Sequence, residues 1–161
     1  MAAAWRRTTK RLPRAEGAQP PRAGSGDAVA MTPKLPSLRL LVVDDNIDAA
    51  QSLCLLLEAL GHETVVEHDA VGAIARAREQ RPQMLFLDIG LPDMDGFELA
   101  RRLRATAETA DAVFVAVTGY GREGDRELAM QAGFDHHMTK PVKLSALLDL
   151  LHRYAPRRQS V

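Results

Sequence analysis

Charged and hydroxyl side chains in this sequence follow short apolar segments, at places where a binding or catalytic site can form. Asp44 and Asp45 follow one apolar run and Asp88 follows another, while Thr118 and Lys140 follow two more. Three carboxylates that lie together repel one another unless a cation binds among them. Their oxygen atoms suit Mg²⁺. No His or Cys accompanies them, so the set does not suit zinc.

A divalent ion held by three carboxylates leaves its opposite side open to an anion. Lys140 can supply a positive charge to that anion, and Thr118 can supply a hydroxyl donor. A phosphoryl group fits both partners and the metal ion together. A carboxylate can itself act as the nucleophile and form an acyl phosphate. The residue types therefore predict a Mg²⁺-dependent aspartyl-phosphate site.

The chain around these residues alternates between strand and helix patterns. Predicted strands cover residues 38–43, 64–66, 84–87 before Asp88, 113–117 before Thr118, and 133–138. Predicted helices cover residues 47–60, 70–80, 97–104, 122–131 and 144–154. The strands are continuous apolar runs, which is typical of a parallel sheet covered by helices on both faces. Ligands bind such sheets beyond the carboxyl ends of the strands, so the five polar side chains are expected to converge there.

The net charge of zero conceals an uneven distribution along the 161 residues. Residues 1–30 carry six basic and two acidic side chains, while residues 31–161 carry 15 basic and 19 acidic ones. This balance argues against a whole-chain nucleic-acid binder or a membrane-surface binder. No apolar run approaches the roughly 20 residues that span a bilayer. The single cysteine, Cys54, excludes an intramolecular disulfide framework and suits a reducing compartment.

Composition also divides the chain into segments. Residues 1–36 hold five of the nine prolines together with several glycines and arginines, so we expect a disordered basic tail. An alternative is that translation starts at Met31, which lies just ahead of the first predicted strand. Residues 37–155 form the predicted domain, and residues 156–161 form a short C-terminal tail.

Four segments at the strand ends resemble the receiver domain of two-component response regulators. They read VVDDN (42–46), LDIGLPDMDG (87–96), VTG (117–119) and MTKPV (138–142). The resemblance covers residues 38 to about 155 and is closest to stand-alone regulators and to receivers of hybrid histidine kinases. It implies a flavodoxin-like, doubly wound five-stranded parallel sheet, a (βα)5 fold, with strand order 2-1-3-4-5.

The resemblance also implies roles for the acidic residues. Asp88 would be the phosphoacceptor, attacking the phosphohistidine of a histidine kinase or phosphotransfer protein. Asp45 would bind Mg²⁺ directly and Asp44 mostly through water, with the backbone carbonyl of Gly90 completing the protein ligands.

Residues near the last two strands receive further roles from the resemblance. Thr118 and Lys140 would bind the phosphoryl group, and the Lys140–Pro141 peptide bond would be cis. The switch position three residues before the lysine, usually Tyr or Phe, is His137 here. Tyr120, two residues past Thr118, would border the phosphoryl site.

Several of these residues have simpler explanations. Asp44 and Asp45 could only cap a helix, Thr118 could be a satisfied strand-end hydroxyl, and Lys140 could lie on the surface. His136 and His137 point to opposite faces of a strand and do not suit a shared metal. Other polar residues have structural explanations: Cys54 in the core, Asp93 and Asp95 shaping their loop, and Asp95 capping the helix that follows.

The leading hypothesis is a cytoplasmic signalling switch, monomeric or weakly dimeric, that acts through protein contacts. Because the chain ends shortly after the last helix, we expect output through the face of the fourth helix, fifth strand and fifth helix. A phosphate sink for a hybrid kinase is one alternative. A phosphohydrolase is another, but haloacid-dehalogenase-type enzymes need a second Asp where this chain has Gly90. A scaffold with a relic site is the third.

Overall fold

Five strands and five helices alternate along the chain in the computed structural model, which describes residues 36–119 and 123–154. The strands are β1 (Arg39–Val43), β2 (Glu63–Glu67), β3 (Met84–Asp88), β4 (Val113–Thr118) and β5 (His136–Thr139). The helices are α1 (Ile47–Ala59), α2 (Ala70–Gln80), α3 (Gly96–Arg104), α4 (Glu123–Gln131) and α5 (Leu144–Tyr154). The predicted tails, residues 1–36 and 156–161, lie outside the described residues except for Pro36.

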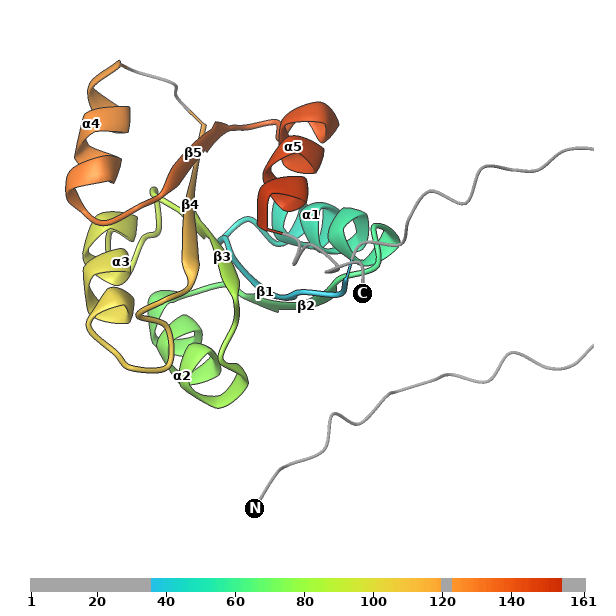
Figure 1. The fold of residues 1–161 in the computed structure, drawn as a ribbon. Coiled ribbons are helices and arrows are strands. Elements are labelled where there is room, and N and C mark those ends of the chain that lie inside the picture. Colours follow the sequence, from blue (N-terminus) through green and yellow to red (C-terminus); the bar gives the residue numbers. More distant parts are fainter. Residues whose placement is uncertain (1–35, 120–122, 155–161) are drawn as a thin grey trace, which may run out of the picture. The chain divides into compact units, whose positions relative to one another are not determined.

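The strands form one parallel sheet in the order β2-β1-β3-β4-β5. Helices α1 and α5 lie on one side of it, and α2, α3 and α4 lie on the other (Figure 1). Two buried clusters fill the two faces, and the fully buried Phe86 and Phe114 belong one to each. The doubly wound flavodoxin-like fold and the strand order are therefore confirmed.

Capping side chains and a glycine account for the bounds of several helices. The side chains of Asn46, Asp69 and Asp95 accept backbone N–H bonds in the first turns of α1, α2 and α3. Gly61, at a φ of 94°, follows α1 as its stop. Asn46 is thus the cap of α1, and the explanation of Asp44 and Asp45 as mere caps does not hold.

The prediction of the fifth strand was wrong at its start. Gly133 has a φ of 94° and donates its N–H to the Met130 carbonyl at 3.2 Å, while the Phe134 N–H donates to the Ala129 carbonyl at 3.0 Å. These two bonds close the end of α4, because a glycine at positive φ satisfies the last helical carbonyls. The pairing with β4 begins only at His136.

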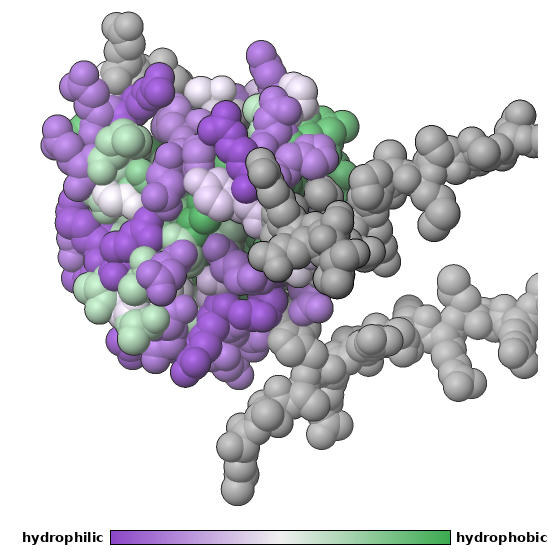
Figure 2. All heavy atoms as spheres, viewed as in Figure 1, coloured by the Kyte–Doolittle hydropathy of each residue, from purple (hydrophilic) through white to green (hydrophobic). Residues whose placement is uncertain are grey.

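The surface around this core is mainly hydrophilic on the face shown in Figure 2, where hydrophobic residues appear as small patches. No helix within the described ranges is both long enough and apolar enough to cross a bilayer.

A buried histidine, His62, lies between α1 and β2 and is only 5% exposed. Its Nδ1 accepts the Leu38 N–H at 3.2 Å, and its buried Nε2 has no partner. The ring is therefore neutral, with the proton on Nε2. Burial lowers the pKa of His62, because a charged ring would lose its hydration.

This geometry predicts that stability falls as the pH drops below about 6.5, the value of an unperturbed histidine. Below that pH the unfolded chain binds a proton at residue 62 that the folded chain does not, so unfolding becomes easier by up to about 1.4 kcal/mol per pH unit. His62→Asn keeps an acceptor for the Leu38 N–H but does not titrate. In urea unfolding between pH 7.5 and 5.5, the parent should lose more stability than the variant. Parallel pH profiles would contradict the assignment.

Candidate functional site

Three carboxylates meet at the carboxyl end of the sheet. Asp88 is the last residue of β3, and Asp44 and Asp45 directly follow β1, its neighbour in the sheet. One oxygen atom from each of the three lies within 4.8 Å of the others. Asp44 and Asp88 are buried, at 6% and 7% exposure, whereas Asp45 is exposed. The site is thus closed on the sheet side and reachable from solvent beside Asp45.

Lys140 brings the positive charge into this group. Its Nζ lies 2.6 Å from Asp44 Oδ2 and 3.2 Å from Asp88 Oδ2. Partial burial disfavours the charged ammonium, but the hydrogen bond to Asp44 and the charge of Asp88 outweigh it and raise the pKa of Lys140. The lysine is therefore a permanent cation of the site, and the explanation of Lys140 as an ordinary surface lysine does not hold.

Thr118 ends β4 beside the lysine and is 6% exposed. Its carbonyl accepts the Lys140 N–H at 2.7 Å, and the Lys140–Pro141 peptide bond is cis. The register places Val117 of β4 beside Asp88 of β3. Thr118 therefore lies one residue past the neighbour of Asp88, at the same edge of the sheet.

Backbone donors hold the two buried carboxylates. Asp44 Oδ1 accepts the Asn46 N–H at 2.9 Å, and Asp88 Oδ1 accepts the Gly90 N–H at 3.0 Å. His68 Nδ1 lies 2.9 Å from the carbonyl oxygen of Asp44. Sequence reasoning missed His68, because no apolar pattern or motif marks it; only the pairing of β1 with β2 brings it to the site.

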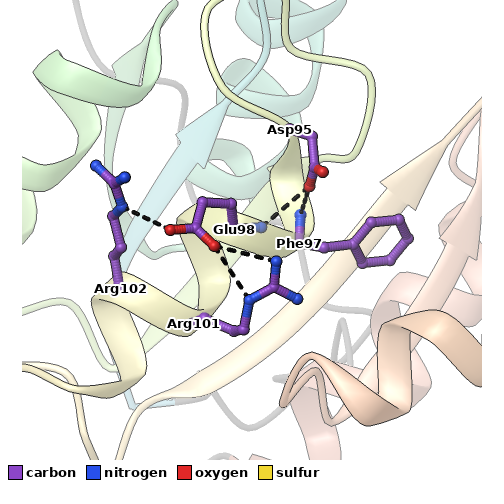
Figure 3. Close-up of polar contacts among 5 residues, drawn as sticks. All are labelled: Asp95, Phe97, Glu98, Arg101 and Arg102. Atoms are coloured by element: carbon purple, nitrogen blue, oxygen red, sulfur yellow. Dashed lines mark hydrogen bonds and ion pairs between the residues drawn. The ribbon is translucent and has the colours of Figure 1, made fainter.

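The loop after Asp88 is fixed by close packing. A Cβ atom on Gly96 would lie 2.5 Å from the Asp88 carbonyl oxygen and 2.6 Å from Ile89 Cα, so the first residue of α3 must be glycine. Asp95 accepts the N–H groups of Phe97 and Glu98, which confirms it as the cap of α3 (Figure 3). The loop therefore cannot move far without moving α3.

Asp93 in the same loop accepts the Ala70 N–H of α2 at 2.9 Å, so the loop is tied to that helix as well.

Of two predicted switch residues, Tyr120 lies outside the described residues and His137 lies within them. His137 lies in β5 beside Ala116, and its Nε2 is buried without a partner. Its neighbour His136 faces α5 instead, with Nε2 2.7 Å from the Tyr154 hydroxyl. Among the described residues neither histidine belongs to the acidic cluster.

Cys54 does not belong to the site either. Burial, together with Glu58, raises the pKa of its thiol to about 11, so the group stays protonated at neutral pH.

A largely apolar cavity of about 470 Å³ adjoins the site. Asp44, Lys140 and the end of β4 form one wall of it. Helix α1 also lines it, through Ala49, Leu53 and Leu56. The charged site therefore borders a hydrophobic surface.

The charges of the site do not balance. Three carboxylates and one ammonium leave a formal charge of −2 within a few ångströms. All oxygen donors are hard, and no described His or Cys joins them. Such a set suits a divalent cation of the Mg²⁺ type.

Known proteins resemble this chain in sequence. Residues 40–152 match the family model of the response regulator receiver domain. An uncharacterized 14.6 kDa protein of Leptolyngbya boryana is 36% identical over 120 residues, which are 74% of this chain and 92% of that protein. The polar-differentiation response regulator DivK of Brucella anthropi is 30% identical over 115 residues, which are 71% of this chain and 94% of DivK.

A solved structure gives the same result. The receiver domain of a sensor histidine kinase from Pseudomonas aeruginosa, with a magnesium ion coordinated in its active site cleft, is 29% identical. It superposes with a TM-score of 0.68 and covers 74% of this chain and 98% of that one. With its five-stranded fold, its cluster of Asp44, Asp45 and Asp88, and Lys140 among them, the chain belongs to the response regulator receiver domain family.

Proposed function

We propose that the protein accepts a phosphoryl group on Asp88 from a phosphohistidine of a histidine kinase or phosphotransfer protein. The observation that carries the proposal is the position of the Asp88 carboxylate, at the end of β3 between the Lys140 ammonium and two further carboxylates. None of these side chains is needed to build the hydrophobic core. A buried nucleophile with one fixed cation is an arrangement suited to an anionic electrophile.

The proposed step conserves atoms and charge. A carboxylate oxygen of Asp88 attacks phosphorus, a new P–O bond forms, and the P–N bond to the donor imidazole breaks with its electron pair returning to nitrogen. Lys140 exchanges its contact with Asp88 for one with a phosphoryl oxygen, and the Thr118 hydroxyl donates to another. These two groups stabilise charge on the transferred phosphoryl group.

The residues fit Mg²⁺ as the cofactor. Asp45, Asp88 and the Gly90 carbonyl would hold the ion directly, and Asp44 would act mostly through water. When bound, the ion would offset the −2 charge of the site and so reduce its repulsion of an anionic phosphoryl group. The magnesium ion in the receiver domain from Pseudomonas aeruginosa supports this assignment.

Two further residues belong to the proposed response. His137 occupies the usual aromatic switch position, and its buried Nε2 lacks a partner in the present state. We expect the ring to reorient when Thr118 engages the phosphoryl group. Tyr120 would border that group and slow the approach of water.

The proposed partner is a histidine kinase or histidine phosphotransfer protein, which would contact the apolar cavity beside the site. We place the chain in the cytoplasm, where a donor phosphorylated from ATP is available. All proposed site residues come from one chain, so a monomer or a weak dimer suffices. Output would use protein contacts, through the face of α4, β5 and α5, rather than nucleic acid or membrane.

Two relatives support different uses of this chemistry. DivK is a response regulator in its own right, while the Pseudomonas receiver belongs to a sensor histidine kinase. The second likeness favours, as the alternative, a phosphate sink for a hybrid kinase. Gly90 stands where a phosphohydrolase of the haloacid-dehalogenase type needs its second Asp, so turnover of small phosphate esters is not proposed.

Acetyl phosphate with Mg²⁺ tests the acceptor. The parent should gain the mass of one phosphoryl group, and Asp88→Asn should gain none, because an amide cannot form the acyl phosphate. Asp95→Asn is the matched control, since Asn caps a helix as well as Asp does. Intact-protein mass spectrometry measures both. An equal mass gain in Asp88→Asn would refute Asp88 as the acceptor, and steady hydrolysis of ester substrates would favour the phosphohydrolase.

Magnesium titration tests the metal ligands. Because Mg²⁺ binds the folded chain, it should raise the midpoint of the parent's thermal unfolding. At a Mg²⁺ concentration 100 times the dissociation constant, the free energy of unfolding should increase by about 2.7 kcal/mol. Asp45→Asn should require at least about tenfold more Mg²⁺ for the same rise in the unfolding midpoint. Asp45 is exposed, so its replacement leaves the fold intact.

Asp48→Asn, an equally exposed acidic position in the first turn of α1, is the control for net charge. It should respond like the parent at constant ionic strength. An Asp45→Asn curve that overlies both would contradict the site.

A further inference from the structure

Helix α3 begins against the backbone of the proposed phosphoacceptor. The Gly96 N–H donates to the Ile89 carbonyl at 3.0 Å, and no Cβ would fit between this residue and the Asp88 carbonyl. Asp95 then fixes the first turn through the N–H groups of Phe97 and Glu98. A displacement of the peptide after Asp88 therefore displaces the start of α3.

The first turn of α3 also contacts the segment between α4 and β5. The Phe97 side chain projects away from the pairs that Glu98 makes with Arg101 and Arg102 (Figure 3). Its ring meets Phe134 edge to face, with centroids 6.3 Å apart, and Phe134 meets Phe114 of β4 at 6.5 Å. Such aromatic pairs hold a preferred geometry in addition to burying area.

The last residue of α3 reaches the same segment from the other end of the helix. Arg104 donates to the Gly133 carbonyl at 2.7 Å and to Asp135 Oδ2 at 2.8 Å. It also donates to the carbonyls of Ala110 and Ala112, and its guanidinium lies 3.9 Å above the Phe114 ring centre. A planar five-donor group can make all these contacts at once, which a lysine cannot.

Residues 133–135, the α4–β5 junction, are thus held by both ends of one rigid helix, roughly 13 Å long at 1.5 Å per residue. Asp135 Oδ2 additionally accepts the Phe114 N–H at 2.8 Å, which ties the junction to β4. Over residues 124–131 of α4, Ala129 is the one buried side chain. The position of α4 therefore depends strongly on its junction.

We propose that α3 is a rigid link that transmits the phosphorylation state of Asp88 to the α4–β5 junction through Phe97 and Arg104. This inference rests on the proposed function, because it concerns what a phosphoryl group on Asp88 changes elsewhere. The link includes neither Thr118 nor His137. It therefore gives the output face a response that does not require the residue at position 137 to be Tyr or Phe.

The test uses beryllofluoride with Mg²⁺ as a phosphoryl mimic and follows backbone amides by NMR. The Gly90 amide reports binding at Asp88, and the amides of residues 133–135 report the junction. In the parent, both sets should shift together. In Arg104→Gln, Arg104→Lys and Phe97→Leu, the Gly90 shift should persist while the shift at the junction falls by roughly half or more.

Matched controls separate transmission from loss of stability. Arg101→Gln removes the same charge from the same helix, but within the described part of the chain the Arg101 guanidinium hydrogen-bonds to Glu98 of α3 itself and not to the junction. Phe86→Leu truncates a buried phenylalanine in the core cluster on the opposite face of the sheet. Both controls should keep the response of the junction, even where Phe86→Leu lowers the unfolding midpoint.

Two results would overturn the proposal, and they are distinguishable. An unchanged shift of the junction in both the Arg104 and Phe97 variants, with Gly90 responding, would refute the link alone. The absence of any Gly90 shift in the parent would refute the proposed function and the link with it.

Discussion

A deficit of positive charge at the carboxyl end of the sheet governs the site. Two nearly buried carboxylates, those of Asp44 and Asp88, share the single ammonium of Lys140, and a third carboxylate lies within 4.8 Å. Burying like charges costs free energy, and one ammonium group offsets only part of that cost. The backbone N–H groups offered to Asp44 and Asp88 reduce the cost, but the net charge remains. A site built in this way gains stability from a divalent cation and, with that cation, can accept an anion.

The fold supplies the geometry that makes such crowding possible. Parallel strands end at a common edge, so residues 44 positions apart in the chain become neighbours once β1 and β3 pair. Helices on both faces keep the strands dry, and the polar residues are confined to the edge. The same architecture places two neighbours beside Asp88: the β3–α3 loop, which follows it in the chain, and Lys140, which pairs with it.

Much of this could be predicted from the sequence. Continuous apolar runs and capping residues placed nearly every element within one or two residues, and polar residues at strand ends identified the acidic cluster with Lys140. The start of β5 could not be found in this way. An apolar residue such as Phe134 suits a buried turn as well as a strand, so the pattern does not distinguish the two. His68 and Arg104 were also missed as contacts. Most of their hydrogen-bond partners are backbone carbonyls, and side-chain patterns carry no information about those.

The exposed arginines of α3 have a consequence for how that helix can move. Glu98 pairs with both Arg101 and Arg102, at 3.0 and 2.9 Å, so these ion pairs form inside the helix. Because the partners lie three and four residues apart in one helix, these ion pairs move with the helix as a unit. Among the described residues, the ion pair that joins α3 to another part of the chain is that of Arg104 with Asp135 in the α4–β5 junction. The electrostatic resistance to displacing α3 is therefore concentrated in one side chain, and replacing that residue alone can tune the stiffness of the helix's attachment.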